Sequence, residues 1–336
     1  MVKIVQFIAS SGMGGAEKFV LTLCNNLAKK GLDIHLLLPK QSPMAKLADQ
    51  KVQLHTIQNS MGRYNPLFYL ELYKLIKKLQ PHIIHTHSAK ATEVFYRLRW
   101  LHNSLHVATK HNGRKGAIFE HIKHVIGVSS QSVNSIKKSQ ATLIHNGIEP
   151  ANITTMNAQN PTFSLLCVGR LDPIKGYDKL INICQKLPFP YELEIIGDGP
   201  WRKTLQLQIQ NLNLQKSIKL TGFSHNIPQK MQQADVVILP SISEGFSLVM
   251  IEALFYSKLL IATPVGGAKE ILHPEFLSTH ENLQQKLEDV YQNYHQYKQK
   301  FATLAHELQP KLTMNSCAQE HIKLYKRLKE SDAQAS

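Results

Sequence analysis

Long apolar runs are missing from this sequence. No stretch reaches the about 18–20 consecutive apolar residues that a helix needs to cross a bilayer, which argues against a transmembrane protein. The start of the chain carries one lysine ahead of a short apolar run. That run is too short for a signal peptide and alternates as a strand does, so we expect residues 3–9 to form the first strand of the fold.

Cysteine is scarce, and its spacing excludes the common metal and disulfide frameworks. Cys24, Cys167, Cys184 and Cys317 are scattered, with no CxxC or CxxH pattern, which favours a reduced, cytoplasmic protein. The sequence also lacks an Asp-x-Asp, so a divalent ion bridging a nucleotide diphosphate has no evident ligands. Neither the Gly-x-Gly-x-x-Gly nor the P-loop spacing occurs. We therefore expect neither a metal nor a cofactor.

Acidic residues are sparse in the N-terminal half. The whole chain holds 39 Lys+Arg and 24 Asp+Glu, a net charge of +15. Residues 1–155 account for 20 of the basic and 7 of the acidic residues, a net of +13, so the remainder is close to neutral. An excess confined to one half indicates that this half meets something anionic, which could be nucleic acid, an anionic membrane or an anionic glycan.

The sequence repeats an alternation of strands and helices. Strands are predicted over residues 3–9, 34–38, 83–87, 107–110, 124–129 and 142–145, and, after a turn-rich linker at 146–162, over 164–169, 192–196, 217–221, 235–240 and 259–263. Helical spacing covers 67–79, 93–101, 180–187 and 313–329, among others. This order predicts two α/β domains, each with a parallel sheet covered on both faces. Such sheets bind ligands at the carboxyl ends of their strands, so two facing sheets would share one cleft.

Three strand-end loops carry residues suited to binding phosphate. Gly14-Gly15-Ala16-Glu17 opens a helix, where free backbone N–H groups favour an anion, although such a turn is often purely structural. Arg170 and Lys175 place two cations on one loop, where they could hold a diphosphate from two directions or could simply be solvated. Gly266-Gly267 is either a nest of backbone amides or an ordinary turn.

Two glutamates occupy the most specific stretch, residues 240–253. Glu244 belongs to a loop after a strand, Ser247 can cap the helix that follows, and Glu252 lies inside that helix. An acid/base pair of a retaining hydrolase needs carboxyls about 5–5.5 Å apart, whereas eight residues of helix span about 12 Å. We favour another use of carboxylates, which is to accept hydrogen bonds from sugar and ribose hydroxyls.

Histidines and a basic-aromatic segment leave further alternatives open. His85 and His87 alternate on one strand and face the same way, and His111 follows the next strand. A His-x-His pair can bind a metal, but no third ligand has an evident spacing, and coincidence is the simpler explanation among 17 histidines. The helix predicted at 93–101 mixes arginines with aromatics. It either lies on an anionic membrane surface or is a core helix with snorkelling arginines.

Several motifs occur together in one order along the chain. They are Gly14-Gly15-Ala16-Glu17, Asn146-Gly147-Ile148, Val168-Gly169-Arg170 through Lys175-Gly176, Gly197-Asp198-Gly199-Pro200, Glu244 with Glu252 as an E-x7-E motif, and Gly266-Gly267 with Glu270. This ordered set resembles glycosyltransferase family 4, a group of retaining enzymes with the GT-B fold. The resemblance implies two Rossmann-like domains facing across a cleft. The acceptor domain would be residues 1–155 and the donor domain 156–312, with a final helix at 313–330 crossing back to the first domain.

The resemblance also implies roles for individual residues. Arg170 and Lys175 would hold the donor diphosphate and neutralise the leaving group, Glu244 would bind the transferred sugar, and Glu252 the ribose. The rest of the donor site would be Gly15, Gly169, Gly245, Phe246, Ser247 and Leu248. His111 would stand near the anomeric carbon and complete the catalytic set, with the acceptor-side residues His87, Lys110 and Asn112. Two positions depart from the family pattern, because Ser247 replaces a small residue and His145 a proline.

The resulting hypothesis is a metal-independent, retaining glycosyltransferase. It would move a hexose or N-acetylhexosamine from a UDP- or GDP-sugar to a lipid-linked or lipopolysaccharide-type glycan. The protein would be cytoplasmic and peripheral on the inner face of the membrane, with an anionic glycan or glycolipid acceptor, an anionic membrane surface and no nucleic acid as partners. The alternatives are a two-domain NAD-dependent oxidoreductase and a basic nucleic-acid-binding protein, although no recognised nucleic-acid module occurs.

Overall fold

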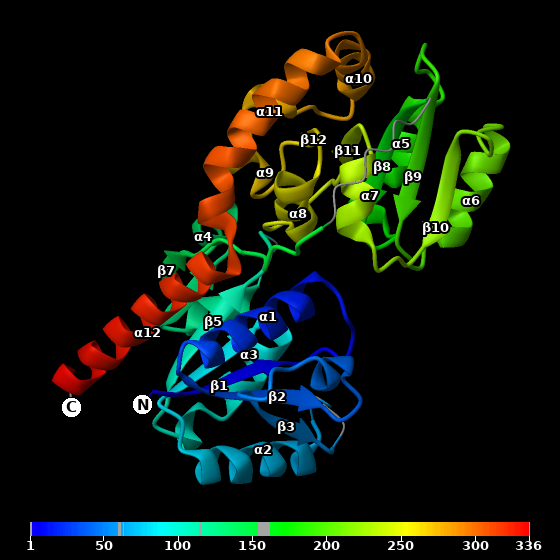
Figure 1. Ribbon diagram of the computed structural model, residues 1–336. Helices are drawn as coiled ribbons and strands as arrows, with labels where there is room; N and C mark the ends of the chain where they lie inside the picture. Colours follow the sequence, from blue (N-terminus) through cyan, green and yellow to red (C-terminus); the bar gives the residue numbers. More distant parts are fainter. Residues whose placement is uncertain (1, 60–61, 63, 114–115, 154–161, 336) are drawn as a thin grey trace. The chain divides into compact units, whose positions relative to one another are not determined.

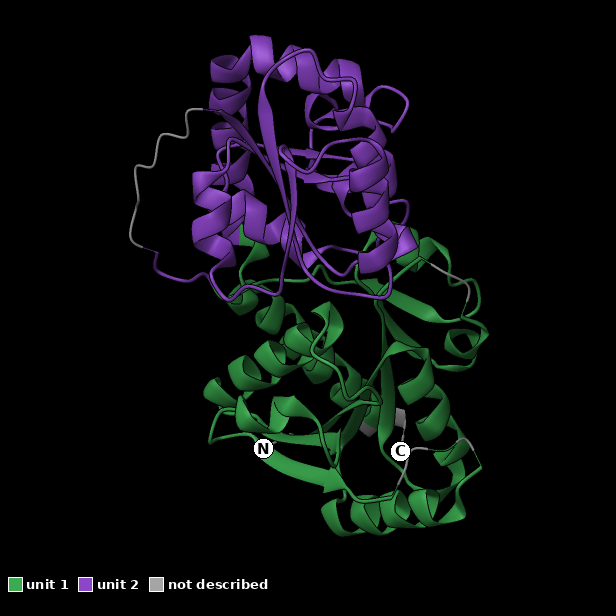
Figure 2. Cartoon of the chain, turned by 90° about the vertical axis from the view of Figure 1, so that its right-hand side faces the viewer, with its two compact units in different colours: residues 1–149, 311–336 green, residues 150–310 purple. Residues whose placement is uncertain are grey.

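The computed structural model describes residues 2–59, 62, 64–113, 116–153 and 162–335. The chain divides into two compact units (Figure 2): unit 1 is residues 1–149 with 311–336, and unit 2 is residues 150–310. Part of the expected linker, 154–161, lies outside the described residues. The division sharpens the charge asymmetry, because unit 1 holds 25 Lys+Arg and 10 Asp+Glu whereas unit 2 holds 14 of each.

Unit 1 is built on a seven-stranded sheet in the order β3-β2-β1-β4-β5-β6-β7 (Figure 1). Its strands are β1 (Lys3–Ile8), β2 (Asp33–Pro39), β3 (Gln53–Ile57), β4 (Ile83–His87), β5 (Leu105–Lys110), β6 (His124–Gly127) and β7 (Gln140–Leu143). Every neighbouring pair is parallel, which confirms the predicted parallel sheet. The strand order reverses between β1 and β4, and sheets of this kind bind ligands at such a switch point.

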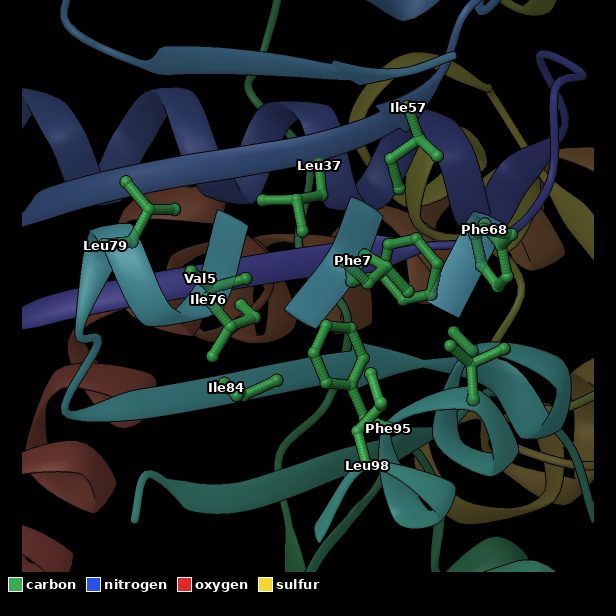
Figure 3. Packing of buried hydrophobic residues seen from close by; sticks show 13 residues of the cluster. Val5, Phe7, Leu37, Ile57, Phe68, Ile76, Leu79, Ile84, Phe95 and Leu98 are labelled. Atoms are coloured by element: carbon green, nitrogen blue, oxygen red, sulfur yellow. The ribbon is translucent and has the colours of Figure 1, made fainter. Parts of the chain in front are cut away.

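A hydrophobic core covers one face of this sheet, under α2 (Pro66–Leu79) and α3 (Ser88–Arg97). Val5, Phe7 and Ile84 point from the strands into it (Figure 3). The Phe7 and Phe95 rings meet edge to face, with centroids 5.2 Å apart. Side chains alternate along a strand. Gln6, next to Val5, and His85, next to Ile84, therefore point to the opposite face of the sheet.

Two local predictions for unit 1 need correction. The sequence patterns do not predict β3, an edge strand whose residues are mostly exposed and which therefore lacks a clear apolar side. The helix expected at 93–101 is instead α3, Ser88–Arg97, followed by a short 3-10 turn, Arg99–Leu101. The Arg99 side chain donates to the Tyr96 carbonyl oxygen at 2.8 Å, which satisfies an acceptor at the end of the helix. Trp100 is 81% exposed, so this segment is not part of the core.

Unit 2 contains a five-stranded parallel sheet in the order β10-β9-β8-β11-β12. Its strands are β8 (Phe163–Val168), β9 (Tyr191–Ile196), β10 (Ile218–Gly222), β11 (Val236–Leu239) and β12 (Leu260–Ala262). The helices are α5 (Tyr177–Cys184), α6 (Arg202–Asn211), α7 (Ile227–Gln233), α8 (Leu248–Tyr256), α9 (Ala268–Ile271), α10 (Leu283–Gln292) and α11 (Tyr294–Leu308). The strand order reverses between β8 and β11, which places the switch point of unit 2 there.

The C-terminal helix α12 (Met314–Ala335) belongs to unit 1, where it packs beside α1 (Gly15–Lys29) (Figure 1). The start of α12 is hydrogen-bonded to the Asn146-Gly147-Ile148 turn, because the Met314 N–H donates to the Ile148 carbonyl at 2.6 Å. A Cβ at Gly147 would lie 2.4 Å from the Thr313 carbonyl oxygen, so this close approach requires glycine. Across the described ranges, no helix is both long and apolar enough to cross a membrane.

Candidate active site

The switch point of unit 2 brings two predicted loops into contact. Residues 169–176 follow β8, and residues 240–247 follow the neighbouring strand β11. The Ile242 N–H donates to the Ile174 carbonyl at 2.8 Å. A Cβ at Gly176, which has φ 68°, would lie 2.1 Å from the Pro240 carbonyl oxygen. Glycine at this position therefore allows both the left-handed backbone and the close packing of the two loops.

Arg170 lies in the first of these loops and stays open to solvent. Its Nε donates to the Asp172 carboxylate at 2.8 Å, while the side chain remains 72% exposed. The other Asp172 oxygen accepts from the Ile174 N–H at 3.0 Å and so caps the turn Pro173–Lys175. Asp172 thus fixes the direction of the guanidinium and leaves most of its N–H groups available to an anion.

Lys175 forms an ion pair with Glu244 across the two loops. Their side chains are only 21% and 23% exposed, and the Ser241 hydroxyl donates to the same Glu244 oxygen at 3.1 Å. In such a half-buried position charges interact more strongly than at an open surface. A phosphate would compete for the lysine, and a sugar hydroxyl could donate to the carboxylate, so the pair suits a ligand that carries both groups.

The start of α8 borders the same loops. The Ser247 hydroxyl accepts from the Met250 N–H at 3.4 Å and caps the helix, whose first backbone N–H groups have no intrahelical partner. The Phe246 ring is buried, so this residue can offer a ligand only its backbone. Glu252 lies in the second turn of α8 and is 9% exposed.

Two glycine motifs support these loops from neighbouring strands. The Gly267 N–H, after β12, donates to the Gly245 carbonyl at 2.7 Å. The Leu171 N–H donates at 2.9 Å to the Asp198 carbonyl, in the Gly197-Asp198-Gly199-Pro200 turn after β9. The structure therefore brings Gly169, Arg170, Lys175, Glu244 and the residues up to Leu248 to one edge of the sheet.

The switch point of unit 1 gathers a smaller set. Gly15 begins α1 after β1, with Gly14 as the N-cap residue. His87 ends β4, and its Nδ1 lies 3.3 Å from Nε2 of His111, which follows β5. Ser88, directly after His87, has φ 70°. This conformation is uncommon for a residue with a side chain and costs about 1–3 kcal/mol, so the backbone is strained beside the histidine pair.

Burial keeps these histidines neutral. It lowers the pKa of His87 well below the usual range and brings the pKa of His111 to about 4. His85 lies on the same face of β4, and burial lowers its pKa in the same way. A neutral imidazole can accept a hydrogen bond from a hydroxyl, whereas it offers a phosphate no charge. Both ring nitrogens of the fully buried His87 have partners in His111 and Gln6, so within this pair only His111 suits a hydroxyl-bearing ligand.

The structure does not bring Lys110 to the histidine pair. Lys110 is 2% exposed, and its Nζ donates to the Ser135 hydroxyl at 2.6 Å. Its neighbour Thr109 contacts His85, so Lys110 points to the opposite face of β5. Asn112 is exposed and directly follows His111. Within the part of the chain that the structure describes, no group of three His, Cys, Asp or Glu side chains could hold a metal ion.

The sequence patterns do not single out several residues that build these sites. Asp172 and Ser241 lie inside predicted loops, and their hydrogen bonds to Arg170 and Glu244 become visible only in the structure. Gln6 and Tyr325 contact the histidine cluster from β1 and α12. A glutamine inside the otherwise apolar residues 4–8 is a signal that could have drawn attention to Gln6.

Comparisons with known proteins match both halves of the chain to one family. Residues 13–152 match the model of Glycosyltransferase Family 4, and residues 155–306 match Glycosyl transferases group 1. A Campylobacter jejuni enzyme, N-acetylgalactosamine-N,N'-diacetylbacillosaminyl-diphospho-undecaprenol 4-alpha-N-acetylgalactosaminyltransferase, is 26% identical over 309 residues, which cover 81% of this chain and 83% of the relative.

Two solved structures share the fold over almost the whole chain. HepE of Anabaena, in complex with UDP-glucose, has a TM-score of 0.82 at 20% identity and covers 97% of this chain and 100% of its own. Sucrose-phosphate synthase from Thermosynechococcus elongatus has a TM-score of 0.83 at 20% identity, with 98% and 100% covered. The predicted GT-B fold of two parallel-sheet units is thereby confirmed, and the chain belongs to glycosyltransferase family 4.

Proposed function

We propose that this glycosyltransferase moves a hexose or N-acetylhexosamine from a UDP- or GDP-sugar to a lipid-linked or lipopolysaccharide-type glycan, with retention of the anomeric configuration and without a metal. The observation that carries the donor half is the Lys175–Glu244 pair next to the exposed Arg170. Two cations suit a diphosphate, and a carboxylate suits the hydroxyls of the attached sugar. UDP is the first nucleotide to test, because HepE was solved with UDP-glucose.

In the proposed reaction, the bond between the anomeric carbon and the leaving phosphate oxygen breaks. The acceptor oxygen bonds to that carbon from the same face, and its proton passes to the leaving phosphate oxygen. Arg170 and Lys175 stabilise the charge that develops on the diphosphate. Glu244 accepts hydrogen bonds from the transferred sugar, Glu252 from the ribose, and His111 acts near the anomeric carbon.

The acceptor half of the proposal rests on charge and on one relative. Unit 1 carries a net charge of +15, whereas unit 2 is neutral. The name of the Campylobacter jejuni enzyme describes an acceptor carried on diphospho-undecaprenol, an anionic lipid carrier. By that likeness we assign this chain an anionic, lipid-linked acceptor at the inner face of the cytoplasmic membrane, with the exposed Asn112 on the acceptor side and the buried His87 behind His111.

Nucleotide-sugars are expected to stabilise the protein against heat. A ligand at about 100 times its Kd adds about 2.7 kcal/mol to the free energy of unfolding, so a panel of UDP- and GDP-sugars, UDP, GDP and NAD should identify the donor by thermal unfolding.

Glu252→Gln should raise the Kd for the nucleotide about 10- to 100-fold, because a hydrogen bond to a charged group contributes about 1.5–3 kcal/mol. Glu275→Gln, at a surface carboxylate paired with Lys300, is the matched control. Stabilisation by NAD alone would contradict the proposal.

Binding to anionic vesicles is expected to depend on salt. The positive charge of unit 1 should draw the protein to phosphatidylglycerol vesicles at low salt, and screening should release it as the Debye length falls from about 10 Å at 0.1 M to about 3 Å at 1 M. Trp100→Ser should weaken binding, since this exposed ring lies beside the Arg99 guanidinium. Phe223→Ser, at an exposed aromatic of unit 2, is the control. Equal sedimentation with neutral and anionic vesicles would refute the membrane assignment.

A further inference from the structure

Unit 1 contains a buried polar network on the face of its sheet that α1 and α12 cover. It joins β1, β4 and β5 to the C-terminal helix and ends at the loop after β5. Its members, which we call the imidazole network, are Gln6, His85, His87, Thr109, His111 and Tyr325. All of them except His111 are at most 1% exposed. Buried polar groups cost free energy unless each finds a partner, so the pattern of their hydrogen bonds is informative.

One branch of the network runs from Gln6 through Tyr325. The Gln6 amide nitrogen donates to the Tyr325 hydroxyl at 3.1 Å. The hydroxyl then has its own proton for Nδ1 of His85, at 2.6 Å. Because burial keeps His85 neutral, its proton is on Nε2, which donates to the Thr109 hydroxyl at 2.7 Å.

The other branch runs from Gln6 to His111. The amide oxygen of Gln6 can only accept, so Nε2 of His87 carries the proton and donates to it at 2.8 Å. Neutral His87 is then an acceptor at Nδ1, and Nε2–H of His111 donates to it across 3.3 Å. It follows that neutral His111 carries its proton on Nε2 and a lone pair on Nδ1. Among the described residues, no hydrogen bond to this Nδ1 is found.

We infer that Tyr325 and Gln6 are positioning residues, which hold His111 in the tautomer that leaves Nδ1 free to accept a hydrogen bond from a substrate hydroxyl. This inference rests on the proposed function, which places His111 near the reacting sugar. Tyr325 and Gln6 do not touch His111. They act through the direction of the hydrogen bonds, because an amide with its nitrogen held by Tyr325 presents its oxygen to His87.

The arrangement makes α12 a part of the site in unit 1. An apolar residue at 325 would fill the same buried space without needing a partner, whereas the tyrosine hydroxyl gives the Gln6 amide nitrogen and His85 Nδ1 their partner. His321, one turn earlier on α12, packs between this network and α1, with its ring centroid 5.8 Å from that of His85 and 6.4 Å from that of Phe19 on α1. The C-terminal helix therefore both covers the network and sets its direction.

The test is the tautomer of His111, read by nitrogen NMR on protein labelled with 15N-histidine, with the His111 signal assigned by its loss in His111→Gln. The wild type should show a protonated Nε2 and an unprotonated Nδ1. In Tyr325→Phe the Gln6 amide loses the partner of its nitrogen and can turn over, so His111 should become a mixture of tautomers. The kcat should fall by the factor by which the competent tautomer is depopulated, about twofold for an even mixture, with an unchanged KM for the donor.

Two further variants test whether the hydrogen bonds of residue 6, rather than the space that its side chain fills, determine the tautomer of His111. In Gln6→Glu a buried carboxyl takes up a proton, so it can still donate to Tyr325 and accept from His87, and the wild-type tautomer should be kept. Gln6→Met can do neither and should give the mixture. Tyr73→Phe, which removes a hydroxyl on α2 instead, should change neither the spectrum nor kcat.

An unchanged His111 spectrum in both Tyr325→Phe and Gln6→Met would overturn the inference, whatever happens to activity. If Tyr325→Phe does not fold, the two Gln6 variants decide the same question. If the wild type transfers sugar from no donor, the proposed function fails, and the spectra still decide whether Tyr325 and Gln6 control the tautomer of His111.

Discussion

Replacing Lys175 with methionine is expected to lower kcat by about 100- to 1,000-fold, the usual loss when one preorganised group that stabilises a developing anion is removed. The half-buried ammonium faces the carboxylate of Glu244 and lies on the same loop as Arg170. In the proposed reaction it would neutralise charge on the leaving diphosphate, which is larger in the transition state than in the bound donor. The measurement is steady-state transfer from the donor that the thermal panel identifies.

The control is Lys216→Met, which changes an exposed lysine of the same unit and should leave kcat and KM as in the wild type. A loss of kcat and of kcat/KM by the same factor would show that Lys175 acts mainly in the transition state. A raised KM with an unchanged kcat would instead mean uniform binding of donor and transition state, and would remove Lys175 from the catalytic set.

Glu244→Gln should have opposite effects on nucleotide binding and on transfer. Glu244 forms an ion pair with Lys175, the side chain that the diphosphate would also bind. A neutral amide releases Lys175, so UDP should bind more tightly, by up to about fivefold for a pair worth about 1 kcal/mol. Transfer should slow, because the amide accepts weaker hydrogen bonds from the sugar than a carboxylate does. Weaker binding of UDP would contradict this account of the pair.

The residues of the donor-side loops could be predicted from the sequence because each set lies within a short stretch of the chain. Arg170 and Lys175 lie on one strand–loop–helix unit, and Glu244 lies on another, so a short motif contains each set. The parallel order of the strands then places both loops at one edge of the sheet. The ion pair between Lys175 and Glu244 depends on the rotamers of two side chains 69 positions apart, and no short-range pattern encodes that contact.

The imidazole network shows what local patterns cannot supply. Gln6 and Tyr325 are 319 positions apart and meet only because α12 returns to unit 1. His85 and His87 were recognisable as a pair on one face of a strand, but their hydrogen bonds give them a different meaning from a metal site. The sequence patterns did not predict the edge strand β3 for a related reason. Its residues are mostly exposed, and its pairing with β2 stabilises it more than an apolar pattern of its own does.

Acidification from about pH 7.5 to about pH 5 is expected to destabilise unit 1 selectively. The described histidines whose pKa burial lowers all belong to this unit: His35, His55, His85, His87, His102, His106, His111, His124 and His321. An unfolded histidine takes up a proton near its ordinary pKa of about 6.5, whereas these folded ones do not. Stability is therefore fully present above about pH 6.5 and is lost as the pH falls towards the folded pKa values.

The size of this loss is set by the depth of each shift. Burial brings the pKa of His321 to about 4, so this side chain alone costs about 2 kcal/mol of stability at about pH 5. A few such histidines would match the whole stability of a domain, which is about 5–15 kcal/mol. Carboxylates with lowered pKa values, such as Glu71 in unit 1 and Asp289 in unit 2, act in the same direction only below about pH 4.5. The range from about pH 6.5 to about pH 5 thus isolates the histidines.

Hydrogen exchange read by mass spectrometry can follow the two units separately, with rates corrected for the intrinsic effect of pH. Peptides from β1 and β4 should lose protection as the pH falls to about 5, while peptides from β8 and β11 keep theirs. His321→Phe removes one group that the unfolded chain can protonate, so the loss of stability in unit 1 should shrink by about 2 kcal/mol. Equal loss in both units, or an unchanged loss in His321→Phe, would show that buried neutral histidines do not govern the acid sensitivity of this glycosyltransferase.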